Sequence, residues 1–420
     1  MCGVVDSCGL WRRWTLRLNA LKKNSYNASF WRMLRRWRVS SAALRTPCFT
    51  RLTAELPHLR ALSLCDITVP CGTDVCSGLT HLTRLYLTRC TLHMELHHLL
   101  QLLPSRLTHL YMCECGLTNL DSAALVRLRA LTQLRYFAFH GHSNLSSVHK
   151  ILAQLPELRY LSLCVAPTFS TLPCPSPLSL PLVSPHPLLS LELLSLDSSS
   201  DVPLDLMKNL SSLRSLTVMF KAPVRPHPSV RVQFGQSEEQ RLLYLLEVLV
   251  AWLKDLSSLA SSSLSALLLE NGPPLQSFLQ FIPSSVTRLS LHALSVRSED
   301  LHTLSTHLPQ LQHLQLLPLR PLDLDSVSLL LELFPHLHLL CLHLPGVPLV
   351  QLDMKELQDL RRCPPSRLLS RVQQLRQVQT QEAHQESDGA ERELLSCGCL
   401  HLLPTTVSTW AETGLKERLK

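Results

Sequence analysis

Glycine is scarce in this sequence, with 12 residues in 420, and tight turns that cradle phosphates or cofactors are correspondingly few. The chain carries no G-x-S-x-G, no H-E-x-x-H, no phosphate-binding glycine loop and no kinase-type motif set. The acids Glu270, Asp300 and Glu332 lie far apart along the chain and fit solvated or helix-capping positions. We therefore predict that the protein is not an enzyme and that it uses no cofactor.

Long apolar runs are also absent. The longest, "LLYLLEVLVAWL" at 242–253, contains Glu247 and is shorter than the ~20 residues that cross a bilayer. The first residues, "MCGVVDSCGL", run into "WRRW" without the apolar core of a secretory signal. The 15 cysteines lack the paired spacing of a disulfide framework, which favours a reducing compartment. We expect a cytoplasmic or nuclear protein without membrane contact.

Charged residues make up only 17% of the chain, and the positive excess is confined to one end. Residues 1–51 hold eleven Lys and Arg against one acid, a net charge of +10, whereas the whole chain is +8. The rest therefore sums to −2 and does not favour nucleic acid or an anionic membrane as a partner. Four of the six tryptophans lie in the same 51 residues, beside the cluster Arg35, Arg36 and Arg38. A nucleic-acid or nuclear-import patch is one interpretation, and we favour a folded cap over the first repeat.

Leucine is abundant and periodic. Hexapeptides of the pattern L-x-x-L-x-L begin at residues 59, 82, 107, 134, 158, 191, 213, 264, 286, 311 and 337. The fourth residue recurs every 22–27 residues, except for one step of 33 and one of 51. This is the period of a leucine-rich repeat, in which L-x-L puts two side chains on the inner face of a short strand.

Helical patterns separate these strands, with leucines three and four residues apart at 94–104, 146–156, 298–309 and 326–335. A proline precedes many of the cores and stops the helix before the next strand. These prolines are Pro57, Pro104, Pro156, Pro283, Pro309 and Pro335. The sequence therefore predicts an α/β leucine-rich repeat solenoid, curved, with parallel strands on the concave face and helices on the convex face.

Two segments resemble known families. "LTRLYLTRCTL" (82–92) and "LTHLYMCECGL" (107–117) are similar to the cysteine-containing repeat common in F-box proteins, and "LWRRWTLRLNALKKNSYNASFWRML" (10–34) resembles the end of an F-box. The leading LP-x-E-x-L-x-x-I-F helix of that motif has no counterpart in the ten residues before Trp11. "LHHLLQLLPSRLTHLYMCECGLTNLD" (96–121) is similar to one repeat of the PRAME-like family. The aromatic and apolar positions that match the F-box, and would contact its adaptor, are Trp11, Trp14, Phe30, Trp31 and Leu34.

Both resemblances imply the same role, that of a substrate-recognition subunit of a cullin-type ubiquitin ligase. The F-box resemblance implies a Skp-type adaptor, and the PRAME-like one a different cullin. The alternative is a leucine-rich repeat scaffold or regulator without a link to ubiquitin. In either case we expect function through binding of a protein partner.

The repeat period divides the chain into three parts. Residues 1–51 form a basic, tryptophan-rich cap or partial F-box, and residues 52–365 form the solenoid. Insertions fall near 166–187, which holds seven prolines, and near 221–257, where the 51-residue step contains one degenerate or one swollen repeat. A closing cap is expected after Leu344, and residues 366–420 are helical at first and then a tail.

Cysteine and histidine pairs raise the possibility of a metal site. None of them shows the two-pair spacing of a zinc finger or ribbon, and we predict no metal. We interpret Cys90, Cys115 and Cys164 as small buried or strand-facing thiols. The pairs are Cys113 with Cys115, His140 with His142, His97 with His98, and "CGCLH" at 397–401.

Alternation along the strands predicts a binding surface. Residues flanking and between the leucines of L-x-L point to the concave face, and four of the six tyrosines fall there on consecutive strands. Tyrosine and arginine are enriched at binding hot spots, although tyrosine also simply suits a strand. The predicted partner-binding residues are Arg84, Tyr86, His109, Tyr111, Tyr136, His140 and Tyr160.

Overall fold

The computed structural model describes residues 15–18, 28–36, 38–44, 54–69, 79–115, 120–143, 146–165, 186–196, 204–221, 238–258, 264–319, 322, 324–344, 347–364, 367–368 and 370–374. These residues belong to two compact units. The first contains the described parts of Met1–Ser143 and Lys150–Leu163, and the second those of Asn144–His149 and Cys164–Asp388.

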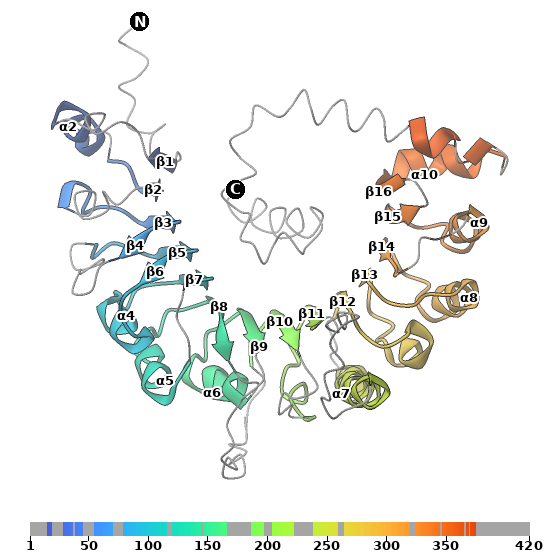
Figure 1. Cartoon of the computed structure of the whole chain (residues 1–420), viewed down its shortest axis with the longest axis horizontal. Coiled ribbons are helices and arrows are strands. Elements are labelled where there is room, and N and C mark those ends of the chain that lie inside the picture. Colours follow the sequence, from blue (N-terminus) through green and yellow to red (C-terminus); the bar gives the residue numbers. More distant parts are fainter. Residues whose placement is uncertain are drawn as a thin grey trace, which may run out of the picture. The chain divides into compact units, whose positions relative to one another are not determined.

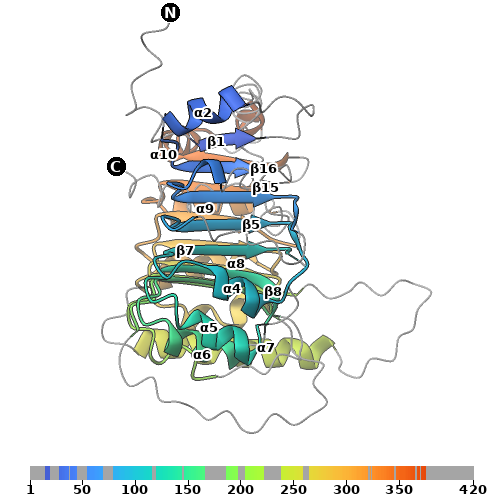
Figure 2. The ribbon, with the colours of Figure 1, turned by 90° about the vertical axis from the view of Figure 1, so that its left-hand side faces the viewer.

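The first unit is built on parallel strands in the order β1-β2-β3-β5-β7-β8-β9. Its helices lie on one side of these strands (Figure 1). The strands are stacked side by side in Figure 2. β4 and β6 form a separate two-stranded pair. The elements are β1 (Thr15–Leu18), α2 (Ala28–Arg36), β2 (Ser41–Leu44), β3 (Ala61–Cys65), β4 (Thr68–Val69), β5 (Arg84–Thr88), β6 (Thr91–Leu92), α4 (Leu96–Leu102), β7 (His109–Cys113), α5 (Ser122–Leu128), β8 (Tyr136–Ser143), α6 (Ser146–Gln154) and β9 (Tyr160–Val165), the last two lying mainly in this unit.

The second unit repeats the plan with parallel strands in the order β10-β11-β12-β13-β14-β15, and an antiparallel β16 ends it. Its elements are β10 (Ser190–Leu196), β11 (Ser215–Phe220), α7 (Glu238–Ser258), β12 (Ala266–Glu270), the 3-10 turns η1 (Leu275–Ser277) and η2 (Leu279–Phe281), β13 (Arg288–His292), α8 (Ser298–His307), β14 (His313–Leu317), α9 (Leu324–Leu333), β15 (Leu339–Leu344), β16 (Val347–Asp353) and α10 (Met354–Arg361). The parallel sheet with helical connections on one side confirms the predicted leucine-rich repeat fold.

Leucine alternation forms the core in both units. Leu85 and Leu87 of β5 are almost completely buried between the sheet and its helices, whereas Tyr86 between them faces the helix-free side. Burying one leucine side chain stabilises the fold by roughly 1.5–3 kcal/mol. Because each repeat adds several such side chains, the stacked repeats share one continuous core within a unit.

Several turns after strands share a backbone feature that the sequence pattern did not predict. Residues that follow strands adopt positive φ: 57° at Asp66, 51° at Arg89, 52° at Glu114 and 56° at Asn271. Such a conformation turns the chain sharply away from the sheet. At the first of these turns Arg89 donates two hydrogen bonds to the Asp66 carboxylate, at 2.6 and 3.0 Å, which joins consecutive repeats.

The predicted thiols lie just beyond these turns. Cys90 donates through Sγ to the carbonyl of Leu64 at 3.3 Å, and Cys115 does the same to Leu87 at 3.3 Å. Both are buried, and the hydrogen bond with Cys90 together with burial raises the pKa of the Cys115 thiol. These two cysteines therefore tie each repeat to the one before, in agreement with the structural role predicted for them. Cys164 carries a half-buried thiol.

The sheet begins earlier in the chain than the leucine pattern indicates. Strand β2 pairs in register with β3, Ala42 opposite Leu62, and β1 pairs with β2. The described part of residues 1–51 thus supplies two strands and helix α2 to the first unit. The pattern search missed β2 because alanine replaces leucine at its fourth core position.

Two spacing irregularities are resolved by the strand register. Leu191, and not Leu194, lies opposite Leu216, so the hexapeptide core is "LLSLEL" at 188–193 and our register there was wrong by three residues. Overlapping L-x-L motifs in "LLSLELLSL" caused the error. Strand β11 pairs directly with β12, so the 51-residue step is one swollen repeat that contains the 21-residue α7.

The end of the second unit is closed as predicted. Antiparallel β16 covers β15, and α10 starts with a reciprocal cap in which Asp353 accepts from the Glu356 amide and Glu356 accepts from the Asp353 amide. No helix within the described segments combines the length and apolarity needed to cross a bilayer.

Candidate functional site

The residues predicted to bind a partner line up on the helix-free face of the first unit. The strand register forms three rows across the sheet: Arg84, His109 and Tyr136 in the first, Tyr86, Tyr111 and Ala138 in the second, and Thr88, Cys113 and His140 in the third. All of the predicted residues are half-buried. We call Tyr86, His109, Tyr111, Tyr136, His140 and Tyr160 the aromatic patch.

Rings in the patch contact one another in two separate sets of three. His109 stacks on Tyr136 with centroids 4.1 Å apart and planes 8° from parallel, and Tyr136 lies 6.0 Å from Tyr160. Tyr86 lies 6.4 Å from Tyr111, which meets His140 edge-on at 5.6 Å. The rings thus form two ladders in neighbouring rows. Contacts of this kind between aromatic rings hold the patch rigid.

His140 is fixed at one edge of the patch. Its Nε2 lies 2.9 Å from the Ser162 hydroxyl, and its Nδ1 lies 3.3 Å from Sγ of Cys113. Cys113 is disulfide-bonded, and its partner lies outside the described residues. A disulfide sulfur has no proton to donate, so Nδ1 carries the imidazole proton and Nε2 accepts from Ser162. Burial lowers the pKa of His140 to about 4, and the ring is neutral at physiological pH.

Arginines surround the first row. The residues that precede the strands are in backbone register, and this places Arg60, Arg135 and Arg159 along one edge of the sheet, with Arg84 beside them. Burial, with the positive charges of Arg84 and Arg135, lowers the pKa of His109 to about 4. Burial also raises the pKa of Tyr86, against the effect of Arg84. We call Arg60, Arg84, Arg135 and Arg159 the arginine row.

The arginine row has no carboxylate partner in the described part of the chain. Elsewhere in this unit arginines are paired: Arg89 with Asp66 at 2.6 Å, and Arg35 with Glu55 at 3.1 Å. Strands β3, β5, β7, β8 and β9 carry neither Asp nor Glu. The helix-free face of the first unit therefore combines rigid aromatic rings with uncompensated positive charge.

Three of the five residues matched to the F-box lie within the described segments. Trp31 and Leu34 of α2 are buried at 0% and 2% exposure, and Phe30 is half-buried with its ring 5.4 Å from that of Trp31, edge to face. Trp11 and Trp14 lie outside the described residues. Helix α2 thus uses Trp31 and Leu34 to pack into the first unit, and Phe30 is the described member of the set with access to solvent.

The acids considered for catalysis have structural positions. Asp300 accepts from the Arg297 amide at 2.7 Å and caps α8. Glu270 lies 3.7 Å from His292 at the ends of β12 and β13, and both side chains are largely buried. Glu332 lies in the last turn of α9. Asp300 and Glu332 therefore occupy the capping and surface positions that we predicted, whereas the prediction was wrong for Glu270, which is largely buried.

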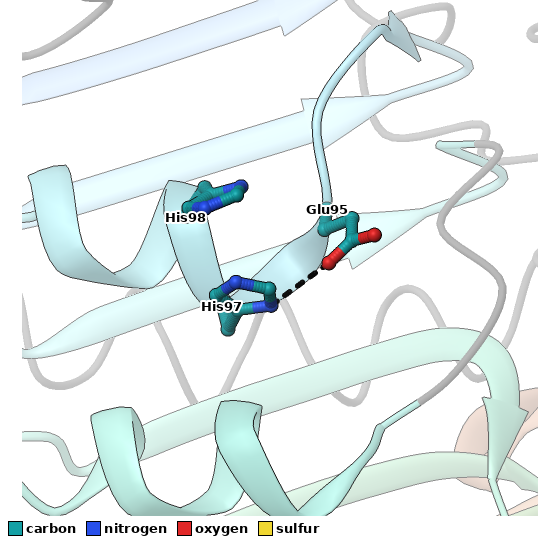
Figure 3. A group of neighbouring side chains, drawn as sticks. All are labelled: Glu95, His97 and His98. Atoms are coloured by element: carbon teal, nitrogen blue, oxygen red, sulfur yellow. Dashed lines mark ion pairs between the residues drawn. The ribbon is translucent and has the colours of Figure 1, made fainter.

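One cluster was missed by the sequence search. Glu95, His97 and His98 at the start of α4 each offer a ligand atom, and the three atoms lie within 4.8 Å of one another (Figure 3). The search for metal sites compared cysteine and histidine pairs with zinc-finger spacing, and so it did not connect His97 and His98 with a nearby carboxylate. The spacing E-x-H-H was the available signal.

Comparisons with known proteins add little to this description. No protein-family model and no curated protein matches the sequence. Among the solved structures that match is an internalin from Listeria monocytogenes, which is 17% identical, with 68% of this chain and 74% of that chain covered and a TM-score of 0.33. Similarity at this level carries no inference about function.

Proposed function

We propose that the protein is a non-enzymatic binding module that holds a segment of a partner protein on the aromatic patch. The observation that carries this proposal is the pair of ring-contact ladders on the helix-free face of β5, β7, β8 and β9. Rigid tyrosine rings provide a large contact area at little cost in side-chain entropy. Half-buried rings also lose less mobility on binding than fully exposed ones.

Charge indicates the chemistry of the partner. The arginine row lies beside the patch without carboxylate partners, and planar guanidinium groups bind carboxylates in bidentate fashion. An acidic peptide segment would place its carboxylates on the arginines and its apolar side chains against the tyrosines. We therefore propose an acidic, extended segment of a protein as the ligand.

Ring geometry favours a peptide over single-stranded nucleic acid. Base stacking needs aromatic faces that are open to the ligand. Here His109 and Tyr136 are stacked face to face, and Tyr111 and His140 form a T-shaped pair. Side chains of a peptide can contact the edges of these rings without separating the rings from one another.

A peptide array tests the proposal. The full chain is incubated with peptides that are acidic and contain apolar residues, with neutral and basic peptides of the same length as comparison. We expect the protein to bind the acidic set, and salt should weaken this binding. The double variant Tyr111→Ala with Tyr136→Ala should raise the Kd at least about tenfold. Arg84→Glu with Arg135→Glu should reverse the preference toward basic peptides.

A matched control removes apolar groups from the helical side. Val126 and Leu243 are 68% and 60% exposed, and Val126→Ala with Leu243→Ala should leave peptide binding unchanged. The proposal is rejected if the tyrosine and control variants bind the acidic set equally well, or if only nucleic acid competes with the tyrosine surface.

The finer form of the proposal is a substrate-recognition subunit of a cullin-type ubiquitin ligase, acting in the cytoplasm or nucleus. It is supported by the resemblance of residues 10–34 to the end of an F-box and by the half-buried Phe30 on α2. The alternative is a scaffold or regulator that uses the same patch without a ligase.

Adaptor recovery separates these two forms. Phe30→Ala removes a half-buried ring, whereas Trp31→Ala would open a cavity beneath it, so Phe30→Ala is the informative variant. If the ligase form holds, affinity purification recovers a Skp-type adaptor, and Phe30→Ala lowers the yield several-fold while thermal stability changes little. Recovery of elongins with another cullin would favour the PRAME-like form, and recovery of no ligase component would leave the scaffold.

A further inference from the structure

We propose that Glu95, His97 and His98 bind a divalent transition-metal ion, with Zn²⁺ as the best match. The three side chains project from the start of α4 in the first unit, on the helical side of the sheet (Figures 1 and 3). One carboxylate and two imidazoles form a ligand set that suits zinc, copper or nickel and leaves a coordination position for water. This site is independent of the aromatic patch and does not rest on the proposed function.

The distance between two of the ligand atoms is that of neighbours on a metal ion. His97 Nδ1 and Glu95 Oε2 lie 3.2 Å apart. In a tetrahedral zinc site, with bonds of about 2.0–2.2 Å, adjacent ligand atoms are roughly 3.3–3.5 Å apart. His97 Nδ1 is buried and makes no hydrogen bond. The 3.2 Å contact between His97 Nδ1 and Glu95 Oε2 therefore has the length expected for two ligands of one ion, but not the geometry of a hydrogen bond.

Helix capping provides a second observation. Glu95 is the N-cap residue of α4, yet its side chain makes no capping hydrogen bond. At the same position of α5 and α10, Asp121 accepts from the Ala124 amide and Asp353 from the Glu356 amide. The Glu95 carboxylate instead turns toward His97 (Figure 3). Glutamate is not among the residues that favour capping, so the Glu95 carboxylate is not held by the helix amides and is available to another ligand.

Exposure allows an ion to enter and the third ligand to adjust. The Glu95 side chain is 74% exposed and that of His97 is 23% exposed. His98 is exposed, and its ring centroid lies 4.0 Å from that of His97. A small rotation of the exposed His98 side chain would bring its nitrogen from within 4.8 Å of the other two atoms to ligand distance. Among the described residues, this is the one group of three such side chains with that geometry.

Cobalt provides a direct readout in the full chain. The protein is stripped with a chelator, and Co²⁺ is titrated while the visible d–d absorption is recorded. We expect the wild type to bind one more equivalent than Glu95→Gln or His97→Ala, or to bind it at least about tenfold more tightly. The chain has 15 cysteines, and cobalt bound to thiolates would add near-ultraviolet charge-transfer bands that the variants retain. The comparison between variants therefore isolates this site.

Thermal unfolding provides a second measure. A ligand that binds only the folded state raises its stability, so Zn²⁺ should raise the Tm of the wild type more than that of either variant. Glu95→Gln keeps the shape of the side chain, and its metal-free Tm shows whether the fold is intact.

The matched control is another histidine pair in the same unit. The rings of His58 and His81 lie 5.6 Å apart and belong to no three-residue ligand group in the described structure. His58→Ala with His81→Ala removes two imidazoles and should leave cobalt binding and the zinc-dependent Tm unchanged. If Glu95→Gln and His97→Ala match the wild type in both measurements, the contact between Glu95 and His97 is an ion pair only and the proposal fails.

Discussion

Single side chains determine how aromatic each row is on the helix-free face of the first unit. Position 86 and position 111 are tyrosines, whereas the next residue in the same row is Ala138, which is 2% exposed. Period-two alternation was sufficient to predict which residues reach this face. It could not predict that Tyr111 would cross to His140, because that contact depends on the small volume of Ala138 and on the rotamers of both rings.

The buried imidazole of His140 makes stability depend on pH. Its pKa is lowered by burial from 6.5 to about 4 in the folded state, so the unfolded chain takes up the proton first as the solution is acidified. Stability from this group is complete above about pH 6.5 and is lost as the pH falls toward 4. His109 and His313 shift in the same direction, also through burial.

We therefore predict that Tm falls between neutral pH and pH 4 more steeply in the wild type than in His140→Gln. The variant keeps a polar side chain beside Ser162 and has no proton to gain in this range. Thermal unfolding across the pH range measures both slopes. The slope in the variant should be reduced but not abolished, because His109 and His313 remain. Parallel curves would show that His140 does not titrate as its burial implies.

The sequence predicted helices and strands where leucines recur at regular spacing, and it missed a strand where another residue replaces leucine. The helical patterns at 146–156 and 298–309 became α6 (Ser146–Gln154) and α8 (Ser298–His307), and the long helix expected from Glu238 is α7. Strand β2 escaped the search because Ala42 occupies a leucine position, although Ala42 is only 1% exposed. A small side chain is accepted there because packing depends on the fit between neighbouring repeats, which a one-dimensional pattern does not contain.

The N-cap residues of helices show that the prediction of functional residues from sequence has the same limit. Asp121, Glu95 and Asp353 occupy equivalent positions at helix starts, and the two aspartates cap their helices, as this residue type favours. The side-chain orientation shows in addition that the Glu95 carboxylate turns toward His97. The candidate metal site therefore needed coordinates, whereas the aromatic patch could be predicted from the sequence because strand alternation fixes which face each residue occupies.

At the scale of the whole molecule, stability is distributed over stacked repeats. Each repeat contacts its neighbours, so the effect of a core mutation is transmitted along the sheet and weakens with distance. The described chain divides into two compact units, each with its own buried leucines. Leu110 lies in β7 of the first unit and Leu314 in β14 of the second, both 1% exposed and both at the fourth core position of a repeat.

We predict that Leu110→Ala destabilises its own unit more than the other. Loss of the buried side chain leaves a cavity and costs roughly 2–5 kcal/mol. Hydrogen exchange followed by mass spectrometry should show faster exchange in β5, β7 and β8, with the strands of the second unit nearly unchanged. Leu314→Ala is the matched control and should give the reverse pattern, centred on β13, β14 and β15. Equal loss of protection in both units from either variant would mean that the chain unfolds as one cooperative body, because a local defect in a nearest-neighbour array loses protection around itself first.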